Sequence, residues 1–163
     1  MQLTKLGKWG ETMRTYLVVV DQTPEAETAL RFAARRAIKT GGAVEILAIV
    51  PKNDFVAWGG VQATIAGEAQ EHAEETVARA LDMLGEEGKF TPNIVVKQGD
   101  AIAVIRETLA ANPEIGALVL GAAASGSPGP LVSHFAGADS GALPCPVMVV
   151  PGSLSREALD RLS

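Results

Sequence analysis

Residues 16–25 read YLVVVDQTPE, and this stretch decides the fold class. Its first five residues are apolar and rich in valine, as in a strand that is buried on both faces of a parallel sheet. Thr23 suits a helix N-cap, Pro24 the first helical position and Glu25 the positive end of the helix dipole. The stretch therefore predicts a buried strand that ends at Asp21 and leads directly into a helix.

The same alternation of strand and helix continues along the chain. With right-handed crossovers, it predicts a single α/β domain of the Rossmann-like, doubly wound type. We expect a five-stranded parallel sheet in the order 3-2-1-4-5, with helices on both faces. The expected strands are Tyr16–Val20, Ala43–Val50, Asn93–Lys97, Ala117–Leu120 and Pro146–Val150. The expected helices span 23–39, 65–87, 100–112 and 131–142, and Ser155 is expected to cap a last short helix.

The longest expected helix has an apolar stripe with a mostly four-residue step, and glutamates cover its other side. A looser segment, 52–63, precedes it. Residues 1–13 are interpreted as an N-terminal tail, 14–152 as the domain and 153–163 as a short C-terminal helix or tail. The members of the stripe are Ile65, Ala69, Ala73, Val77, Leu81 and Leu84.

Length and charge exclude several classes of protein. The chain has 163 residues, enough for one domain, and a net charge of −5 with no basic stripe. Nucleic-acid binding and membrane-surface binding are therefore not expected. Cys145 is the only cysteine, so no internal disulfide forms. No apolar run approaches the roughly 20 residues that span a bilayer. These features predict a cytoplasmic protein.

The loop GAAASGSPGP, residues 121–130, is the most informative segment for function. Small residues after a strand allow backbone N–H groups to approach phosphates closely. Yet Ser127-Pro128 stand where a Walker A loop needs a lysine, and the turn after the first strand lacks a G-x-G-x-x-G pattern. The residues alone leave two interpretations open: a phosphate-binding loop or a tight turn.

Two segments resemble the universal stress proteins. The opening YLVVVDQTPEAETALRFAARRA is similar to their first strand, acidic turn and alanine-rich helix. The close, LVLG…GALPCPVMVVPG, is similar to their final strand-loop-helix-strand unit. The resemblance covers 14–152 and extends to a bacterial subgroup with a GPGPLVS-like loop, here SPGPLVS at 127–133. It implies a regulatory protein of the stress response that forms a homodimer, often through the final strand.

Many members of this family bind ATP through the motif G-x2-G-x9-G-[ST], from which this sequence departs. Gly121 matches the first glycine, but Ala124 replaces the second. Gly126 and Gly129 form a pair in another register, in which Asp139 replaces the third glycine. Two functions therefore remain open. The chain binds ATP with Mg²⁺, or AMP, at the carboxyl ends of the strands, or it is a non-ATP-binding member with a degenerate loop that acts through protein–protein contacts.

The candidate ligand-binding residues come from the strand ends and the loop. By resemblance, Asp21 matches the acidic residue that faces the ribose or metal, and Ile49 the position whose backbone contacts adenine. Without a ligand, Asp21 would solvate a strand end and Ile49 would be core. The candidates are Asp21, Gln22, Thr23, Ile49, Gly121, Ser125, Gly126, Ser127, Ser133 and His134.

Catalytic and metal sites are not expected. The sequence offers His134 no identified carboxylate partner, and Cys145 has no basic neighbour that would favour its thiolate. His72 with Glu68 and Glu75 is more typical of an exposed helix face than of a closed metal site. Phosphoryl transfer requires positioned cations, and the loop has no lysine or arginine. We therefore predict that the protein is not an enzyme.

Overall fold

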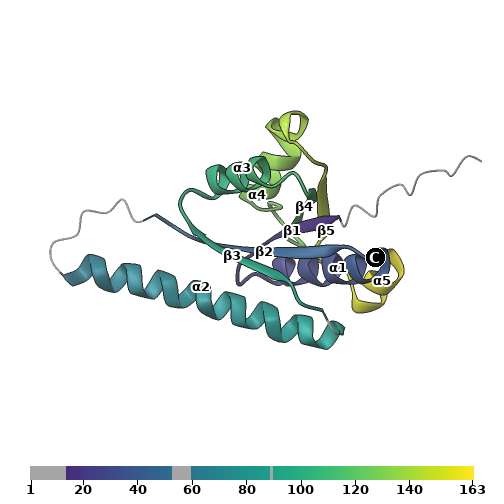
Figure 1. Cartoon of the computed structure of the whole chain (residues 1–163), viewed down its shortest axis with the longest axis horizontal. Helices are drawn as coiled ribbons and strands as arrows, with labels where there is room; N and C mark the ends of the chain where they lie inside the picture. The colour runs from purple at the N-terminus through teal and green to yellow at the C-terminus, as the bar shows by residue number, and fades with distance from the viewer. Residues whose placement is uncertain (1–13, 53–59, 89) are drawn as a thin grey trace, which may run out of the picture.

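The computed structural model describes residues 14–52, 60–88 and 90–163. Five parallel strands form one sheet in the order β3-β2-β1-β4-β5 (Figure 1). This confirms the predicted doubly wound α/β fold and its strand order. The predicted tail, 1–13, and residues 53–59 of the predicted looser segment lie outside the described residues. The strands are β1 (Thr15–Val20), β2 (Ala43–Val50), β3 (Asn93–Gln98), β4 (Ile115–Ala122) and β5 (Val147–Pro151).

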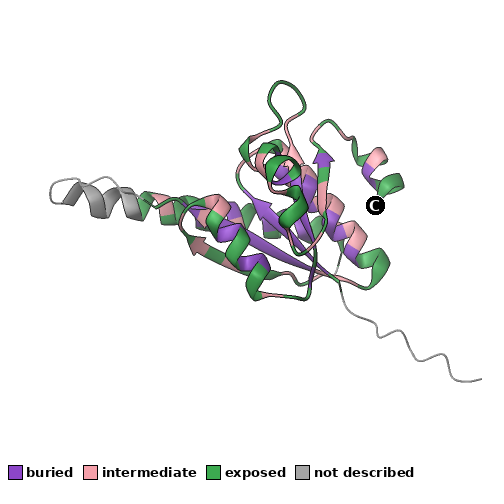
Figure 2. Cartoon of the chain, turned by 90° about the horizontal axis from the view of Figure 1, so that it is seen from above, coloured by how far each residue is buried: buried purple, intermediate pink, exposed green. Residues whose placement is uncertain are grey.

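Helices cover both faces of the sheet, as predicted. On one face lie α1 (Pro24–Thr40), α2 (Gly60–Glu87) and α5 (Arg156–Leu162), and on the other α3 (Ala101–Ala111) and α4 (Pro130–Ser133). Successive residues of β1 alternate between two apolar cores, Val18 belonging to the first and Leu17 to the second. Figure 2 shows the buried residues concentrated along the strands and on the helices next to them.

The turn from β1 into α1 forms as its residues predict. Thr23 accepts a hydrogen bond on its side chain from the N–H of Ala26 at 3.3 Å, and Pro24 occupies the first turn. Gly41 ends the helix with φ +67°, a left-handed conformation that glycine adopts without strain. The buried side of α1 is almost entirely alanine. These small side chains allow the helix to approach the sheet closely.

The helix predicted over 131–142 is wrong in extent. The α-helix stops after Ser133, a π-helical turn follows at His134–Ala138, and a 3₁₀ turn at Ser140–Ala142. The break falls at Gly137, whose φ of −106° and ψ of −111° are not helical. Glycine has the largest backbone freedom to lose in a helix, and here it supplies the bend.

The apolar stripe predicted for α2 is also corrected. Leu81 is 39% exposed, whereas Ala73, Ala80, Met83 and Leu84 are buried. In a helix of 3.6 residues per turn, each four-residue step moves the side chain about 40° further around the helix axis. The predicted stripe therefore leaves the buried face by Leu81. None of the helices in the described part of the chain is long and apolar enough to cross a membrane.

Candidate functional site

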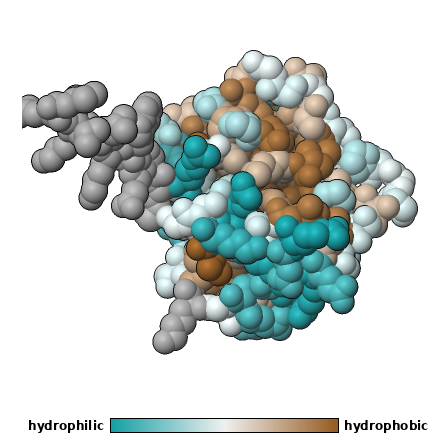
Figure 3. Space-filling model, turned by 90° about the vertical axis from the view of Figure 1, so that its right-hand side faces the viewer, coloured by the Kyte–Doolittle hydropathy of each residue, from teal (hydrophilic) through white to brown (hydrophobic). Residues whose placement is uncertain are grey.

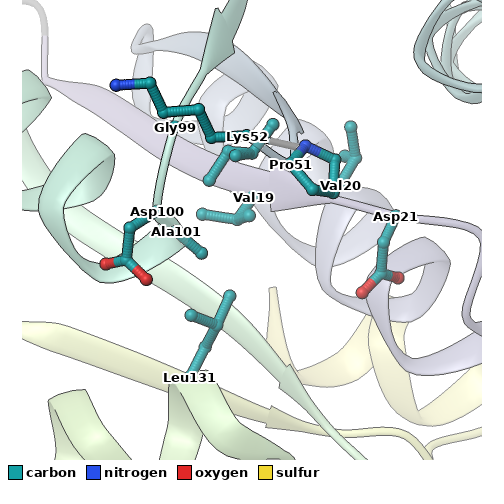
Figure 4. A pocket seen from close by; sticks show the side chains of 10 residues that line it. Val19, Val20, Asp21, Pro51, Lys52, Gly99, Asp100, Ala101 and Leu131 are labelled. Atoms are coloured by element: carbon teal, nitrogen blue, oxygen red, sulfur yellow. The ribbon is translucent and has the colours of Figure 1, made fainter. Parts of the chain in front are cut away.

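A hollow lies at the carboxyl ends of β1, β2 and β4. Strand order reverses between β1 and β4, which is where open α/β sheets bind ligands. Two adjoining cavities of about 470 and 440 Å³ occupy this position, and together we call them the cleft (Figure 4). The residues that line both cavities are Val19, Asp21, Asp100, Ala101 and Leu131.

The floor of the first cavity is apolar and lies beside an open edge of β2. Val19, Val20, Ile49 and Pro51 line it. The pairing of β2 with β1 ends at Ala48, whereas its pairing with β3 continues through Ile49 to Val50. Ile49, a candidate from the sequence, thus lies in the lining of this cavity. Its side chain is also packed against the core between the sheet and α3.

Asp21 lies directly after β1 and lines both cavities of the cleft. Its Oδ1 accepts hydrogen bonds from the N–H of Thr23 at 2.9 Å and from the Thr23 hydroxyl. Within the described part of the chain, no hydrogen bond reaches Oδ2. The two interpretations of Asp21 are compatible: one oxygen supports the start of α1, and the other remains available to a ligand. Thr23 lines the second cavity, whereas Gln22 lines neither.

Asp100 is a residue of the cleft that was not among the candidates from the sequence. Its side chain caps α3 by accepting a hydrogen bond from the N–H of Ala103 at 3.0 Å, and it lines both cavities. Figure 4 shows Asp21 and Asp100 on opposite sides of the pocket, with Leu131 pointing into the space between them. The sequence does contain a signal for this position, because Asp100 follows shortly after β3 much as Asp21 follows β1. Parallel strands bring both carboxyl ends to the same edge of the sheet.

Gly121 is required by packing. A Cβ on this residue would overlap the backbone carbonyl of Glu25 in the first turn of α1. A Cβ added to Gly152 would likewise come too close to the Glu25 side chain and to the carbonyl of Ala122. Gly121 does line the second cavity. Its missing side chain is nevertheless explained by α1 without any phosphate.

The tip of the loop after β4 lies away from the cleft. The N–H of Ala123 donates to the carbonyl of Pro128 at 3.2 Å, which folds the loop back on itself. Ser125, Gly126 and Ser127 are exposed at the resulting tip, and none of them lines either cavity. The wall of the cleft consists instead of the segment Pro128–Val132.

Ser133 and His134 also lie outside the cleft lining. His134 does have a carboxylate partner, contrary to the sequence expectation: its Nε2 lies 2.8 Å from Oδ2 of Asp139. Arg106 of α3 forms an ion pair with the same oxygen. This cluster joins α3, whose first residues line the cleft, to the segment after α4, which lies outside the cleft lining.

Neither Cys145 nor His72 shows the surroundings of a catalytic or metal-binding residue. Burial raises the pKa of the Cys145 thiol, although a backbone hydrogen bond from Leu118 opposes the change. A raised pKa disfavours the reactive thiolate. His72 lines a further cavity of about 330 Å³ beside α2, which shares Val20, Asp21, Ile49 and Pro51 with the first cavity of the cleft. In the ranges that the structure describes, there is no group of three or more His, Cys, Asp or Glu residues suited to a metal ion.

The charges around the cleft are mainly negative. Asp21, Glu25 and Asp100 contribute carboxylates, and Lys52 contributes the only cation among the described residues that line either cavity. Figure 4 shows the Lys52 side chain extending away from Asp21. A ligand in the cleft would therefore meet an apolar floor and a rim of hydrogen-bond acceptors.

Residues 13–151 match the model of the universal stress protein family. No curated protein matches the chain.

Solved structures match the fold over most of the chain at low sequence identity. The universal stress protein UspA from Lactobacillus plantarum is 20% identical, with a TM-score of 0.57, over 85% of this chain and 97% of its own. A universal stress protein from Archaeoglobus fulgidus in complex with dAMP is 19% identical, with a TM-score of 0.55, over 84% and 96%. One from Arabidopsis thaliana with AMP bound is 14% identical, with a TM-score of 0.52, over 85% and 91%.

Proposed function

Because the chain belongs to the universal stress protein family, we propose that it serves the stress response by binding an adenine nucleoside or nucleotide in the cleft. One observation carries this proposal: an apolar cavity at the strand-order reversal is bordered by Asp21, one of whose carboxylate oxygens accepts no hydrogen bond within the described residues. The dAMP and AMP complexes of proteins with the same fold support the choice of ligand class.

The proposed ligand uses features of both cavities. The base lies on the apolar floor, where Val19, Ile49 and Leu131 supply contact area and exclude water. The backbone of β2 beyond Ala48 is available on its β1 side for hydrogen bonds to the edge of the base. A ribose hydroxyl donates to Oδ2 of Asp21. Mg²⁺ has a place only with a polyphosphate such as ATP.

Isothermal titration with adenosine and AMP tests this function, after extraction has shown that no nucleotide co-purifies. We expect saturable binding, and Asp21→Ala should weaken the affinity about tenfold, the equivalent of about 1.4 kcal/mol. Ala101 lines both cavities, so the bulky ring of Ala101→Phe should fill space that the ligand needs and abolish binding. Unchanged affinity in both variants, with melting curves that show them folded, would contradict the assignment of the ligand to this cleft.

We further propose that the protein binds its ligand without catalysing a reaction on it. Support comes from the cleft lining, in which Lys52 is the only cation among the described residues. Phosphoryl transfer normally depends on several positioned cations and a group that orients the nucleophile. Chromatography of ATP incubated with the protein and Mg²⁺ should show no protein-dependent ADP or AMP.

We also propose a cytoplasmic homodimer in which the β5 edges of two copies meet. Support comes from Val149 of β5, which is 40% exposed on a strand that pairs within the described chain only with β4. Apolar strand edges are usually covered. Figure 3 faces the side of the molecule where β5 lies. It shows hydrophobic residues gathered in the upper part of this face. The single cysteine agrees with a reducing compartment.

The departure of the loop from the ATP-binding motif favours a second candidate function. The tip Ser125–Ser127 is exposed and lies outside the cleft lining, so another protein could contact it without entering the cleft. In this alternative the chain is a non-ATP-binding member that acts through protein–protein contacts. The absence of any binding heat with adenosine, AMP and ATP would favour it.

A further inference from the structure

We infer that the cleft selects nucleosides and nucleoside monophosphates and discriminates against nucleoside triphosphates. This inference rests on the proposed function and concerns the charge of the ligand. Its starting point is that α1, α3 and α4 all begin at the cleft. Helix N-termini attract anions through their free N–H groups and the helix dipole. At α1 and α3 the protein's own side chains already occupy free N–H groups, whereas the short α4 has no side-chain cap.

The N-terminus of α3 already carries an anion. The carboxylate of Asp100 accepts a hydrogen bond from the N–H of Ala103 and so occupies one of the free N–H groups that a phosphate would use. Asp100 also lines both cavities. A phosphate could use this helix only by approaching a carboxylate of like charge.

The N-terminus of α1 is satisfied in a similar way. The Thr23 hydroxyl accepts the hydrogen bond from Ala26, and Pro24 has no N–H to offer. Glu25 and Glu27 place two negative charges in the first turn. Glu25 itself lines the second cavity, beside Gly121 and the segment Pro128–Val132. A phosphate directed toward this loop would therefore approach a residue that carries a negative charge.

The wall formed by the loop offers few donors of its own. Pro128 and Pro130 lack backbone N–H groups, and α4 is only four residues long. The serines of the tip lie outside the cleft lining. A ribose has the opposite chemistry to a phosphate chain, because its hydroxyls donate to the carboxylates that repel phosphates. The same rim thus favours the sugar and opposes each added charge.

The test measures adenosine, AMP and ATP by isothermal titration in EDTA at low salt. We expect ATP to bind at least about tenfold more weakly than adenosine, with AMP between them. Higher salt should reduce the difference in affinity between adenosine and ATP, because it screens charges at exposed carboxylates. Mg²⁺ should also reduce this difference in affinity, since it neutralises part of the triphosphate charge.

Paired variants locate the effect. Glu25→Gln with Asp100→Asn removes two charges from the cleft and preserves the shape of both side chains, and asparagine remains a good N-cap. This double variant should recover most of the lost ATP affinity. The matched control, Asp82→Asn with Glu107→Gln, removes two charges from exposed helix positions outside the cleft lining and should leave the ratio unchanged.

The outcomes separate this inference from the proposed function. If none of the three ligands binds, both are overturned. If adenosine or AMP binds and ATP binds as tightly as AMP in EDTA, the proposed function stands and the selectivity is overturned. If the control restores ATP affinity as much as the cleft variant does, the discrimination comes from the net charge of the whole molecule, which also overturns the inference.

Discussion

Residues of the cleft take their roles from the elements packed around them. Gly121 looks like part of a phosphate loop in the sequence, yet the carbonyl of Glu25 occupies the space that a side chain would need. Asp21 looks like a ligand residue or a helix-start residue, and its two oxygens allow both. The residue type limits what each position can do, and the neighbours decide which use applies.

At this scale we predict that Gly121→Ala destabilises the fold independently of any ligand. The added methyl group would force the end of β4 away from the first turn of α1, and such overpacking costs about 1–3 kcal/mol. Urea unfolding measures the loss. Gly116→Ala is the matched control in the same strand, since its Cβ would meet Arg14 atoms at ordinary distances of 3.5 Å and more. Equal stability of the two variants would contradict the packing explanation.

At the scale of elements, an ion network joins the helices on one face of the sheet. Glu87 near the end of α2 accepts hydrogen bonds from Arg31 at 2.6 Å and from Arg35 at 2.7 Å, both on α1. Arg35 also pairs with Asp160 of α5. The Glu87 side chain is only 8% exposed. This network therefore fixes α1, α2 and α5 relative to one another, in addition to their apolar contacts.

The network predicts a pH dependence of stability. Burial alone would raise the pKa of Glu87, but hydrogen bonds from Arg35 and Arg31 outweigh it and hold the pKa below its usual range. The stabilisation is therefore present above the unfolded-state pKa of about 4.3 and is lost as the pH falls through the lower folded-state pKa. Urea unfolding from pH 7 down to pH 3 should show this acid loss.

Glu87→Gln should remove that contribution. At pH 7 we expect a loss of roughly 2 kcal/mol, less than the roughly 3–5 kcal/mol for breaking a fully buried pair, because both arginines keep other partners. The variant should also lose less stability than the wild type between pH 5 and pH 3. Glu86→Gln is the control, since its side chain is 58% exposed and should matter little. An unchanged acid slope in Glu87→Gln would assign the pH dependence to other groups.

At the scale of the whole molecule, the sheet has two edges that each expose an apolar residue. Val149 on β5 is 40% exposed, and Val96 on β3 is 41% exposed. Either edge could pair with a second copy, because unpaired strand edges carry free N–H and C=O groups. The proposed dimer uses the β5 edge, and the β3 edge provides an internal comparison.

We predict that Val149→Lys yields a monomer at concentrations where the wild type is a dimer. A lysine at the paired edge would bury an uncompensated charge in the interface, whereas Val96→Lys on the opposite edge should leave the dimer intact. Analytical ultracentrifugation of the three proteins measures the outcome. The reverse pattern would assign the dimer to β3, and three monomers would contradict the dimer altogether.

The sequence by itself determined the fold. The valine-rich run into Asp21, the Thr23-Pro24 start of α1 and the regular alternation that follows are local signals, and each reports burial or capping within a few residues. A parallel sheet with helices on both faces followed from these elements together with the chirality of crossovers, and the predicted strand order agrees with the structure. The positions of Asp21 and Ile49 at the strand ends were predictable for the same reason.

The tertiary structure alone decided the composition of the cleft. It brought Asp100 from after β3 to face Asp21, and it left Ser125–Ser127 outside the cleft lining. It also explained Gly121 by the carbonyl of Glu25 and gave His134 its partner Asp139 beyond a bend at Gly137. Each of these facts depends on distances between segments that the chain brings together only on folding. Such distances leave no periodic trace in the sequence, whereas burial and capping do.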